Sequence, residues 1–244
     1  MALGIIGGTG LSRLDGLTID REEAVPTRWG EPSAPLLFGR IGDTEVVFLA
    51  RHGNPHRIPP HKVNYRANIQ ALKDAGVDRV VAVAAVGGIT DRAGPSAVLI
   101  PDQIIDYTYG RSMTFFEDDL DEVVHIDFSW PYCAELRAEL CAAAVSAGVD
   151  AVNSGVYAAT QGPRLETAAE IRKLAADGCD IVGMTGMPEA ALAREAGLCY
   201  ASLAVVANWG AGISADEITM ADIERELETG MSHVKRILET LLSG

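Results

Sequence analysis

Short apolar runs that alternate with helical patterns constrain the fold of this chain more than any other feature. Six such runs are rich in Val, Ile, Leu and Ala, and they lie at residues 3–6, 46–50, 80–86, 156–160, 181–184 and 200–206. Runs of this kind are typical of strands in a mainly parallel or mixed sheet that helices cover. We therefore expect an α/β fold.

Three segments carry helix signals. Residues 64–75 have a helical pattern that stops at Gly76, and Thr167 and Glu170 form a capping box ahead of residues 171–176. A third helix is expected from Thr219 to near the C-terminus. No low-complexity linker and no fixed-period repeat divides the chain, so we expect one domain over residues 1–244.

Charge and composition exclude several classes of function. The net charge of −14 opposes binding to nucleic acid or to an anionic membrane, so an anionic ligand has to be held by a few local donors. The longest apolar run, residues 80–89, is too short to span a membrane, and no export signal is visible, which predicts a soluble cytoplasmic protein. The four cysteines show no C-x-x-C spacing, so we expect reduced thiols and no zinc site; they are Cys133, Cys141, Cys179 and Cys199.

The apolar run at residues 203–208 ends on Asn208 and opens into Trp-Gly-Ala-Gly. A carboxamide can donate and accept hydrogen bonds side by side, so an Asn at the end of a buried strand suits recognition of a planar heterocycle. An Asn beside Gly is also a common turn residue. Both interpretations remain open at this point.

Three further strand ends carry groups that suit an anion. Gly-Gly-Thr-Gly at residues 7–10 can present backbone N–H groups and the Thr9 hydroxyl, although Arg13 stands where a dinucleotide fingerprint needs Gly. Arg51 and His52 follow another strand and could clamp phosphate oxygens. The run at residues 84–88 ends in paired glycines that let an anion approach the backbone. A plain structural turn is the alternative for each glycine pair.

A rival interpretation starts from the same Arg-His-Gly. Histidine phosphatases carry this motif after a strand, with the His as phosphoryl acceptor, but they need a second catalytic His late in the chain. This chain offers His125 and His233 there. A metal site at His52 and His56 is disfavoured because no carboxylate stands at a suitable spacing.

Five motifs taken together resemble the trimeric purine nucleoside phosphorylase and methylthioadenosine phosphorylase family. They are Gly-Gly-Thr-Gly at 7–10, Ala-Arg-His-Gly at 50–53, Pro-His-Lys-Val-Asn-Tyr at 60–65, Gln-Gly-Pro-Arg at 161–164 and Gly-Met-Thr-Gly-Met-Pro-Glu at 183–189. The resemblance implies the phosphorylase/hydrolase-like fold, a twisted mixed sheet flanked by helices, in a homotrimer. It also implies reversible phosphorolysis of a nucleoside, with inorganic phosphate as co-substrate and without a cofactor or metal.

The resemblance also implies roles for individual residues. Phosphate is expected at Thr9, Arg51, His52, the Ala85 N–H and Thr185, with Met184 beneath the ribose. The base is expected at Leu165, Glu166, Asn208 and Gly210. The sugar is expected near His56, Tyr65, Met220 and Ile223, and His125 is expected to reach the site of a neighbouring subunit. The groups expected to carry the chemistry are Asn208, His52 and Thr185.

Three positions indicate the substrate, and one of them is Asn208, which stands where methylthioadenosine enzymes carry an Asp. Glu166 stands where methylthioadenosine enzymes carry a small residue, and a carboxylate can accept the N1 proton of hypoxanthine but opposes the bare N1 of adenine. Met220 stands where purine nucleoside phosphorylases carry a His near the 5′-hydroxyl, and a thioether suits a methylthio group. We therefore expect S-methyl-5′-thioinosine as substrate, with inosine or guanosine as the alternative. Leu165 and Gly210 depart from the family, where a Phe and, in methylthioadenosine enzymes, an Asp stand.

Overall fold

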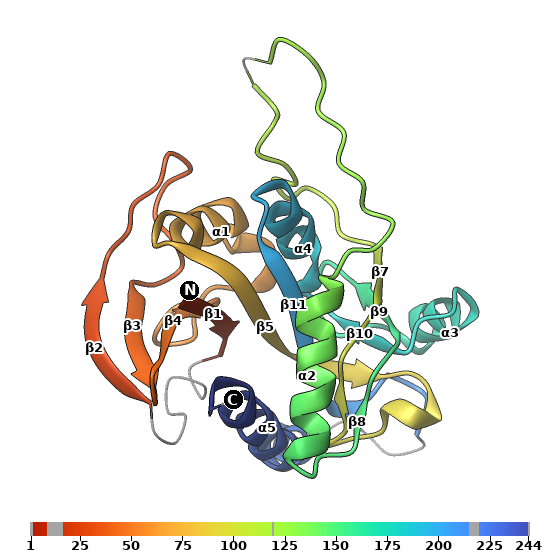
Figure 1. Cartoon of the computed structure of the whole chain (residues 1–244). Coiled ribbons are helices and arrows are strands. Elements are labelled where there is room, and N and C mark those ends of the chain that lie inside the picture. The colour runs from red at the N-terminus through yellow and green to blue at the C-terminus, as the bar shows by residue number, and fades with distance from the viewer. Residues whose placement is uncertain (1, 9–16, 119, 215–219, 244) are drawn as a thin grey trace.

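A mixed sheet forms the centre of the protein, with helices packed on both faces (Figure 1). The computed structural model describes residues 2–8, 17–118, 120–214 and 220–243, and it confirms the predicted α/β class. The strands run in the order β2-β3-β4-β1-β5-β10-β9-β7, while β11 joins β5 to β6 and β6 pairs with β8. Their bounds are β1 Ala2–Gly7, β2 Thr18–Glu23, β3 Leu36–Ile41, β4 Thr44–Ala50, β5 Val77–Gly88, β6 Val98–Leu99, β7 Gln103–Asp106, β8 Ala151–Val152, β9 Val156–Ala159, β10 Ile181–Gly183 and β11 Cys199–Trp209.

The helices pair on opposite sides of the two longest strands. Helices α2 and α5 pack on each other and on β11, and α1 packs on α4 and β5 (Figure 1). Their bounds are α1 Tyr65–Asp74, α2 Ala134–Ser146, α3 Ala168–Ala176, α4 Gly186–Glu195 and α5 Met220–Ser243, with short 3₁₀ turns at Pro60–Lys62 and Asp91–Ala93. In the described residues, no helix is long and apolar enough to cross a membrane.

Each of the six predicted runs coincides with a strand, although β9 and β10 end one residue before the predicted ends, and the three predicted helices are α1, α3 and α5. The capping box of α3 is present with both of its hydrogen bonds. The sequence did not predict β2, whose residues are all exposed and largely charged, because no apolar alternation marks it. It also missed α4, because Gly186 and Pro188 stand in its first turn and Met187 has non-helical backbone angles.

Strand β5 lacks a strand partner along part of one edge. On that edge β1 pairs with β5 as far as Ala82, and β10 pairs with it from Gly87 onward. Residues 83–86 between them face neither strand on this side, while their other edge pairs with β11. Backbone polar groups on such an edge need partners. The gap therefore leaves room, in the middle of the sheet, for side chains and a ligand to reach the backbone.

One expectation about the cysteines is wrong. Cys133 and Cys199 form a disulfide across 66 positions of sequence, whereas reduced thiols were expected. Cys133 directly precedes α2, its backbone N–H donates to the Tyr200 carbonyl at 2.8 Å, and Cys199 begins β11. Spacing gave no signal for this pair, because the contact arises from packing between α2 and β11. Cys141 and Cys179 are free thiols, as expected.

We predict that Cys133→Ser lowers the free energy of unfolding by roughly 2–4 kcal/mol without reductant, because the cross-link restricts the unfolded chain. Chemical denaturation of parent and variant measures the difference. Cys141→Ser is the matched control, since Cys141 lies on the same helix with a free thiol. Four reactive thiols in the denatured, unreduced parent would contradict the disulfide.

Candidate active site

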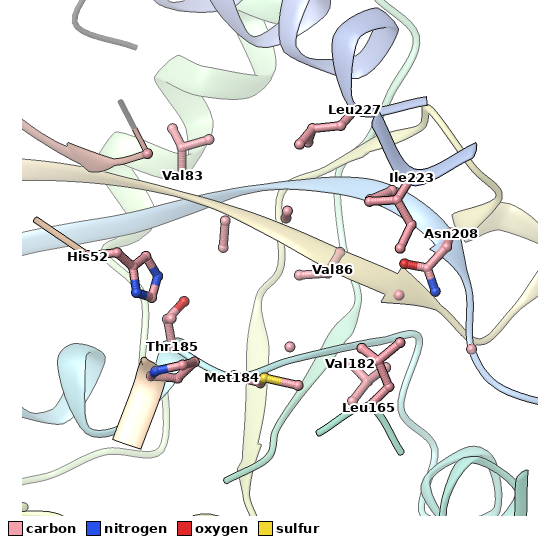
Figure 2. Close-up of a pocket in the computed structure, with 18 of the residues that line it drawn as sticks. His52, Val83, Val86, Leu165, Val182, Met184, Thr185, Asn208, Ile223 and Leu227 are labelled. Atoms are coloured by element: carbon pink, nitrogen blue, oxygen red, sulfur yellow. The ribbon is translucent and has the colours of Figure 1, made fainter. Parts of the chain in front are cut away.

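A cavity of about 500 Å³ lies over the gap beside β5. Its walls come from the ends of β1, β4, β10 and β11, from the loop before α3, and from α5. Figure 2 shows two polar ends, with His52 and Thr185 at one and Asn208 at the other. Met184 lies between them. The cavity is therefore long enough to offer two different polar groups to one ligand.

Arg51 enters this cavity from the end of β4 and is almost fully buried, at 2% exposure. Its Nε and Nη2 donate to the two carboxylate oxygens of Glu189 at 2.7 and 2.8 Å, and its Nη1 donates to the Val83 carbonyl at 2.9 Å. Burial opposes the charged guanidinium, but the Glu189 carboxylate outweighs it and raises the pKa of Arg51. These bonds use three of the five N–H groups and leave two for a ligand.

Glu189 makes this geometry rigid. It lies on α4 with 0% exposure and also accepts from the Tyr200 hydroxyl at 2.9 Å. A buried carboxylate has to be paired and hydrogen-bonded, and here two N–H groups of Arg51 and the Tyr200 hydroxyl satisfy it. The sequence assigned no role to Glu189, because the partner of Arg51 is 138 positions away.

His52 presents an acceptor to the cavity. Its Nδ1 donates to the Ile58 carbonyl at 2.8 Å, because a carbonyl oxygen can only accept. Burial, together with the Arg51 charge, lowers the pKa of His52 to about 4. The ring is therefore neutral near pH 7, and Nε2 carries a lone pair. The His56 ring stacks on it with centroids 4.5 Å apart.

Two neutral donors complete this end of the cavity. Thr185 is buried just before α4, and its side chain makes no capping bond to that helix. Alternation along β5 puts the Ala85 N–H on the same edge as the Val83 carbonyl, which faces Arg51 across the gap. Donors from β4, β5 and the β10–α4 junction thus converge, and this geometry suits a small oxyanion.

The opposite end offers acceptors. Asn208 donates from Nδ2 to the Trp209 carbonyl at 2.7 Å, which leaves Oδ1 to accept from a ligand. Glu166 lies across the cavity before α3 and accepts from the Thr160 hydroxyl at 2.7 Å. Leu165 is half-exposed and lies at the same end of the cavity as Asn208 in Figure 2. Gly210 also lines this end, close to Ile171 of α3.

Helix α5 closes the cavity with apolar side chains. Ile223, Leu227 and Met231 line it, and Figure 2 shows the first two above the strands. The predicted residue Met220 begins α5, but its side chain lies outside the part that the structure describes. Thr9 also lies outside the described residues, and its neighbour Gly8 lines the cavity.

The structure does not bring two predicted residues to the cavity. Tyr65 is buried behind it, where its hydroxyl donates to the Pro60 carbonyl at 3.0 Å. The expectation of a sugar contact therefore has no support from the lining, which includes Pro60 and His56 instead. His125 is exposed on the long segment between β7 and α2, which extends away from the sheet (Figure 1).

Arg111 lies on the long segment between β7 and α2, and no sequence pattern indicated a role for it. Its guanidinium donates to the carbonyls of Met184 and Met187 at 2.8 and 2.6 Å and to that of Thr160 at 3.2 Å. It also donates to the backbone and side-chain oxygens of Gln161. Arg111 thereby ties the loop after β9 to the loop after β10. A lone Arg in a polar segment carries no sequence signal for this role.

Comparisons with known proteins identify the family of this chain. The family model of the phosphorylase superfamily matches residues 2–243. A probable S-methyl-5′-thioinosine phosphorylase of Pseudomonas syringae pv. tomato is 57% identical over 98% of this chain and 97% of its own length. A 6-oxopurine nucleoside phosphorylase of Pyrococcus furiosus is 43% identical over 97% of this chain and 90% of its own length. The structure of the methylthioadenosine phosphorylase of Schistosoma mansoni in complex with adenine matches with a TM-score of 0.94 at 33% identity. The match covers 100% of this chain and 91% of that chain.

We predict that Arg51→Met lowers the free energy of unfolding by about 3–5 kcal/mol, because it leaves the buried Glu189 carboxylate unpaired. The double variant Arg51→Met/Glu189→Leu should recover much of that loss, since no unpaired charge remains. Urea denaturation of the three proteins measures both effects. Equal stability of parent and single variant would show that the ion pair does not hold the fold.

The lowered pKa of His52 predicts how the stability of the fold depends on pH. The unfolded imidazole binds a proton near pH 6.5 and the folded one near pH 4, so the unfolded state holds more protons between these values. The contribution of His52 to the free energy of unfolding should therefore decrease as the pH falls from about 6.5 to about 4. NMR titration, with the His52 signal assigned by its loss in His52→Asn, should give a midpoint near pH 4. A midpoint near 6.5 would contradict the buried, neutral ring.

Proposed function

This chain belongs to the phosphorylase superfamily, and we propose that it catalyses phosphorolysis of S-methyl-5′-thioinosine to hypoxanthine and 5-methylthioribose 1-phosphate. It is an enzyme that transfers a pentosyl group, as nucleoside phosphorylases do. The observation that carries the proposal is a single cavity with two polar ends and an apolar wall. One end, which we call the oxyanion cradle, is formed by Arg51, His52, Ala85 and Thr185. The other end offers the acceptors of Glu166 and Asn208 to a base. Relatives at 50–57% identity carry the same activity in their names.

Phosphate is proposed to lie at the His52 end. Two N–H groups of Arg51, the Ala85 N–H and the Thr185 hydroxyl donate to its oxygens. The neutral His52 accepts through Nε2 from a protonated phosphate oxygen. Phosphate held beneath the sugar is aimed at C1′, and its charge stabilises the oxocarbenium-like ribosyl group as the glycosidic bond breaks. Met184 provides the surface beneath the ribose.

Hypoxanthine is proposed to lie at the other end. The Glu166 carboxylate accepts a hydrogen bond from the N1–H group of hypoxanthine, and adenine has no proton at N1. The Oδ1 atom of Asn208 can accept a hydrogen bond from N7–H when N7 carries a proton taken from solvent, so it favours departure of hypoxanthine as the neutral base. Leu165 and Val182 provide apolar contacts beside the ring (Figure 2). None of these steps needs a cofactor or metal, and the proposal includes neither.

The sugar assignment depends on α5. Ile223, Leu227 and Met231 present no polar atom to the cavity, so a 5′-hydroxyl there would lose its hydrogen bonds whereas a methylthio group would be buried favourably. Inosine or guanosine is the alternative substrate, and the 43% identical Pyrococcus relative supports it. Superfamily membership leaves the histidine phosphatase interpretation without support.

We also propose that the enzyme works as a cytoplasmic homotrimer. The long segment between β7 and α2 exposes Tyr109, Val123 and Trp130 as well as His125 (Figure 1). Exposed apolar side chains in such numbers favour a subunit interface. His125 would then reach a neighbouring site. A reducing cytoplasm would open an accessible disulfide, so stability measured with reductant is the relevant value there.

The substrate proposal predicts that kcat/KM for S-methyl-5′-thioinosine exceeds that for inosine by roughly five- to a hundredfold at saturating phosphate, because a stranded hydroxyl costs about 1–3 kcal/mol. Ile223→Asn should narrow that ratio, since a carboxamide can pair with the 5′-hydroxyl. Steady-state assays of both nucleosides give the two constants.

Leu241→Asn is the matched control, because Leu241 lies on α5 but does not line the cavity. It should leave the ratio unchanged. A parent that prefers inosine would refute the methylthio assignment and leave the 6-oxopurine nucleoside alternative. A parent that splits neither nucleoside, with or without phosphate, would refute the reaction.

A further inference from the structure

Thr160 connects the strand β9 to the carboxylate that faces the base end of the cavity. Its hydroxyl lies 2.7 Å from Glu166 Oε1 and 3.3 Å from the Gly183 carbonyl. Thr160 itself does not line the main cavity, whereas Glu166 does. The hydroxyl therefore touches the carboxylate from behind, on the side away from the proposed ligand.

The two distances indicate which way the proton points. A threonine hydroxyl has one proton to donate, and the Gly183 carbonyl already accepts the Thr160 backbone N–H at 2.8 Å. The shorter contact, to Glu166, is the one that suits a charge-assisted bond to a carboxylate. Glu166 is thus held as an acceptor, with Oε1 bonded to Thr160 and Oε2 left for a ligand.

The backbone on both sides of this bond is fixed. The Thr160 N–H donates to Gly183 and its carbonyl accepts from Arg111, so the hydroxyl cannot move far. Glu166 directly precedes Thr167, the N-cap of α3, whose capping box is complete. A bond between two anchored segments orients the carboxylate before a ligand arrives.

We propose that Thr160 is a positioning residue that sets the base specificity of this enzyme by holding Glu166 as an acceptor aimed at N1 of the purine. The inference rests on the proposed function of the same site. An acceptor can read the N1 proton of a 6-oxopurine, but it repels the N1 lone pair of a 6-aminopurine. Without the Thr160 hydroxyl, the carboxylate can rotate away from the position in which it faces N1.

The test is Thr160→Val, which replaces the hydroxyl by a methyl group of similar size. KM for S-methyl-5′-thioinosine should rise roughly five- to tenfold with little change in kcat, because a ground-state contact to the base is weakened. Preference over S-methyl-5′-thioadenosine should fall by a similar factor. Thr160→Ser keeps the hydroxyl and should restore both values.

The matched control is Thr90→Val. Thr90 makes the same kind of bond, from its hydroxyl to the Asp180 carboxylate at 2.9 Å, but outside the cavity. This variant should leave KM for both nucleosides unchanged. A double-variant cycle then tests the route of the effect: in a Glu166→Ala background, Thr160→Val should change KM by less than twofold, because no side-chain acceptor remains for the Thr160 hydroxyl to orient.

The outcomes separate the inference from the proposed function. A parent that prefers the 6-aminopurine nucleoside would refute the base assignment itself. A parent that prefers the 6-oxopurine, with KM and preference unaltered in Thr160→Val, would overturn the role of Thr160 alone. An equal loss in the parent and Glu166→Ala backgrounds, or a loss that Thr160→Ser does not restore, would show that Thr160 acts through packing and would also overturn it.

Discussion

The buried ion pair between Arg51 and Glu189 is the interaction on which the rest of the site depends. It joins the end of β4 to α4. In addition, the Tyr200 hydroxyl on β11 donates to Glu189, and Arg51 donates to the Val83 carbonyl on β5. A buried charge without a partner is strongly destabilising, so these four elements have to reach their places together. The positions of His52, next to Arg51, and of the loop that begins α4 follow from that requirement.

The ion pair lies where the sheet is interrupted. Along one edge of β5 the strand partners stop at Ala82 and resume at Gly87, and Arg51 satisfies the Val83 carbonyl between them. Had β1 continued, its backbone would have taken up the groups on this edge, and no N–H could reach a ligand. The break in the sheet thus provides the opening, and the ion pair keeps the opening from collapsing.

Local signals account for how much the sequence could predict. The buried strands and the α3 capping box were predictable because periodicity and capping are local. The gathering of Arg51, His52 and Asn208 followed from motifs at strand ends. Glu189 was not assigned because its partner Arg51 lies 138 positions away, and Arg111 was not assigned because it bonds mainly to backbone carbonyls. The Cys133–Cys199 disulfide was missed for the same reason, since it depends on how α2 meets β11.

The charge balance of the cradle bears on how the proposed reaction is accelerated. Glu189 neutralises Arg51, and His52 is neutral, so a phosphate in the proposed site would meet directed N–H and O–H groups and little net positive charge. A strong excess of positive charge would stabilise free phosphate and its transition state alike, and such uniform binding does not lower the barrier. Directed donors instead fix the orientation of phosphate and leave its negative charge available to the ribosyl cation as that cation develops. A chain with net charge −14 can therefore use an anionic nucleophile, because a few directed donors bind and orient phosphate without a basic protein surface.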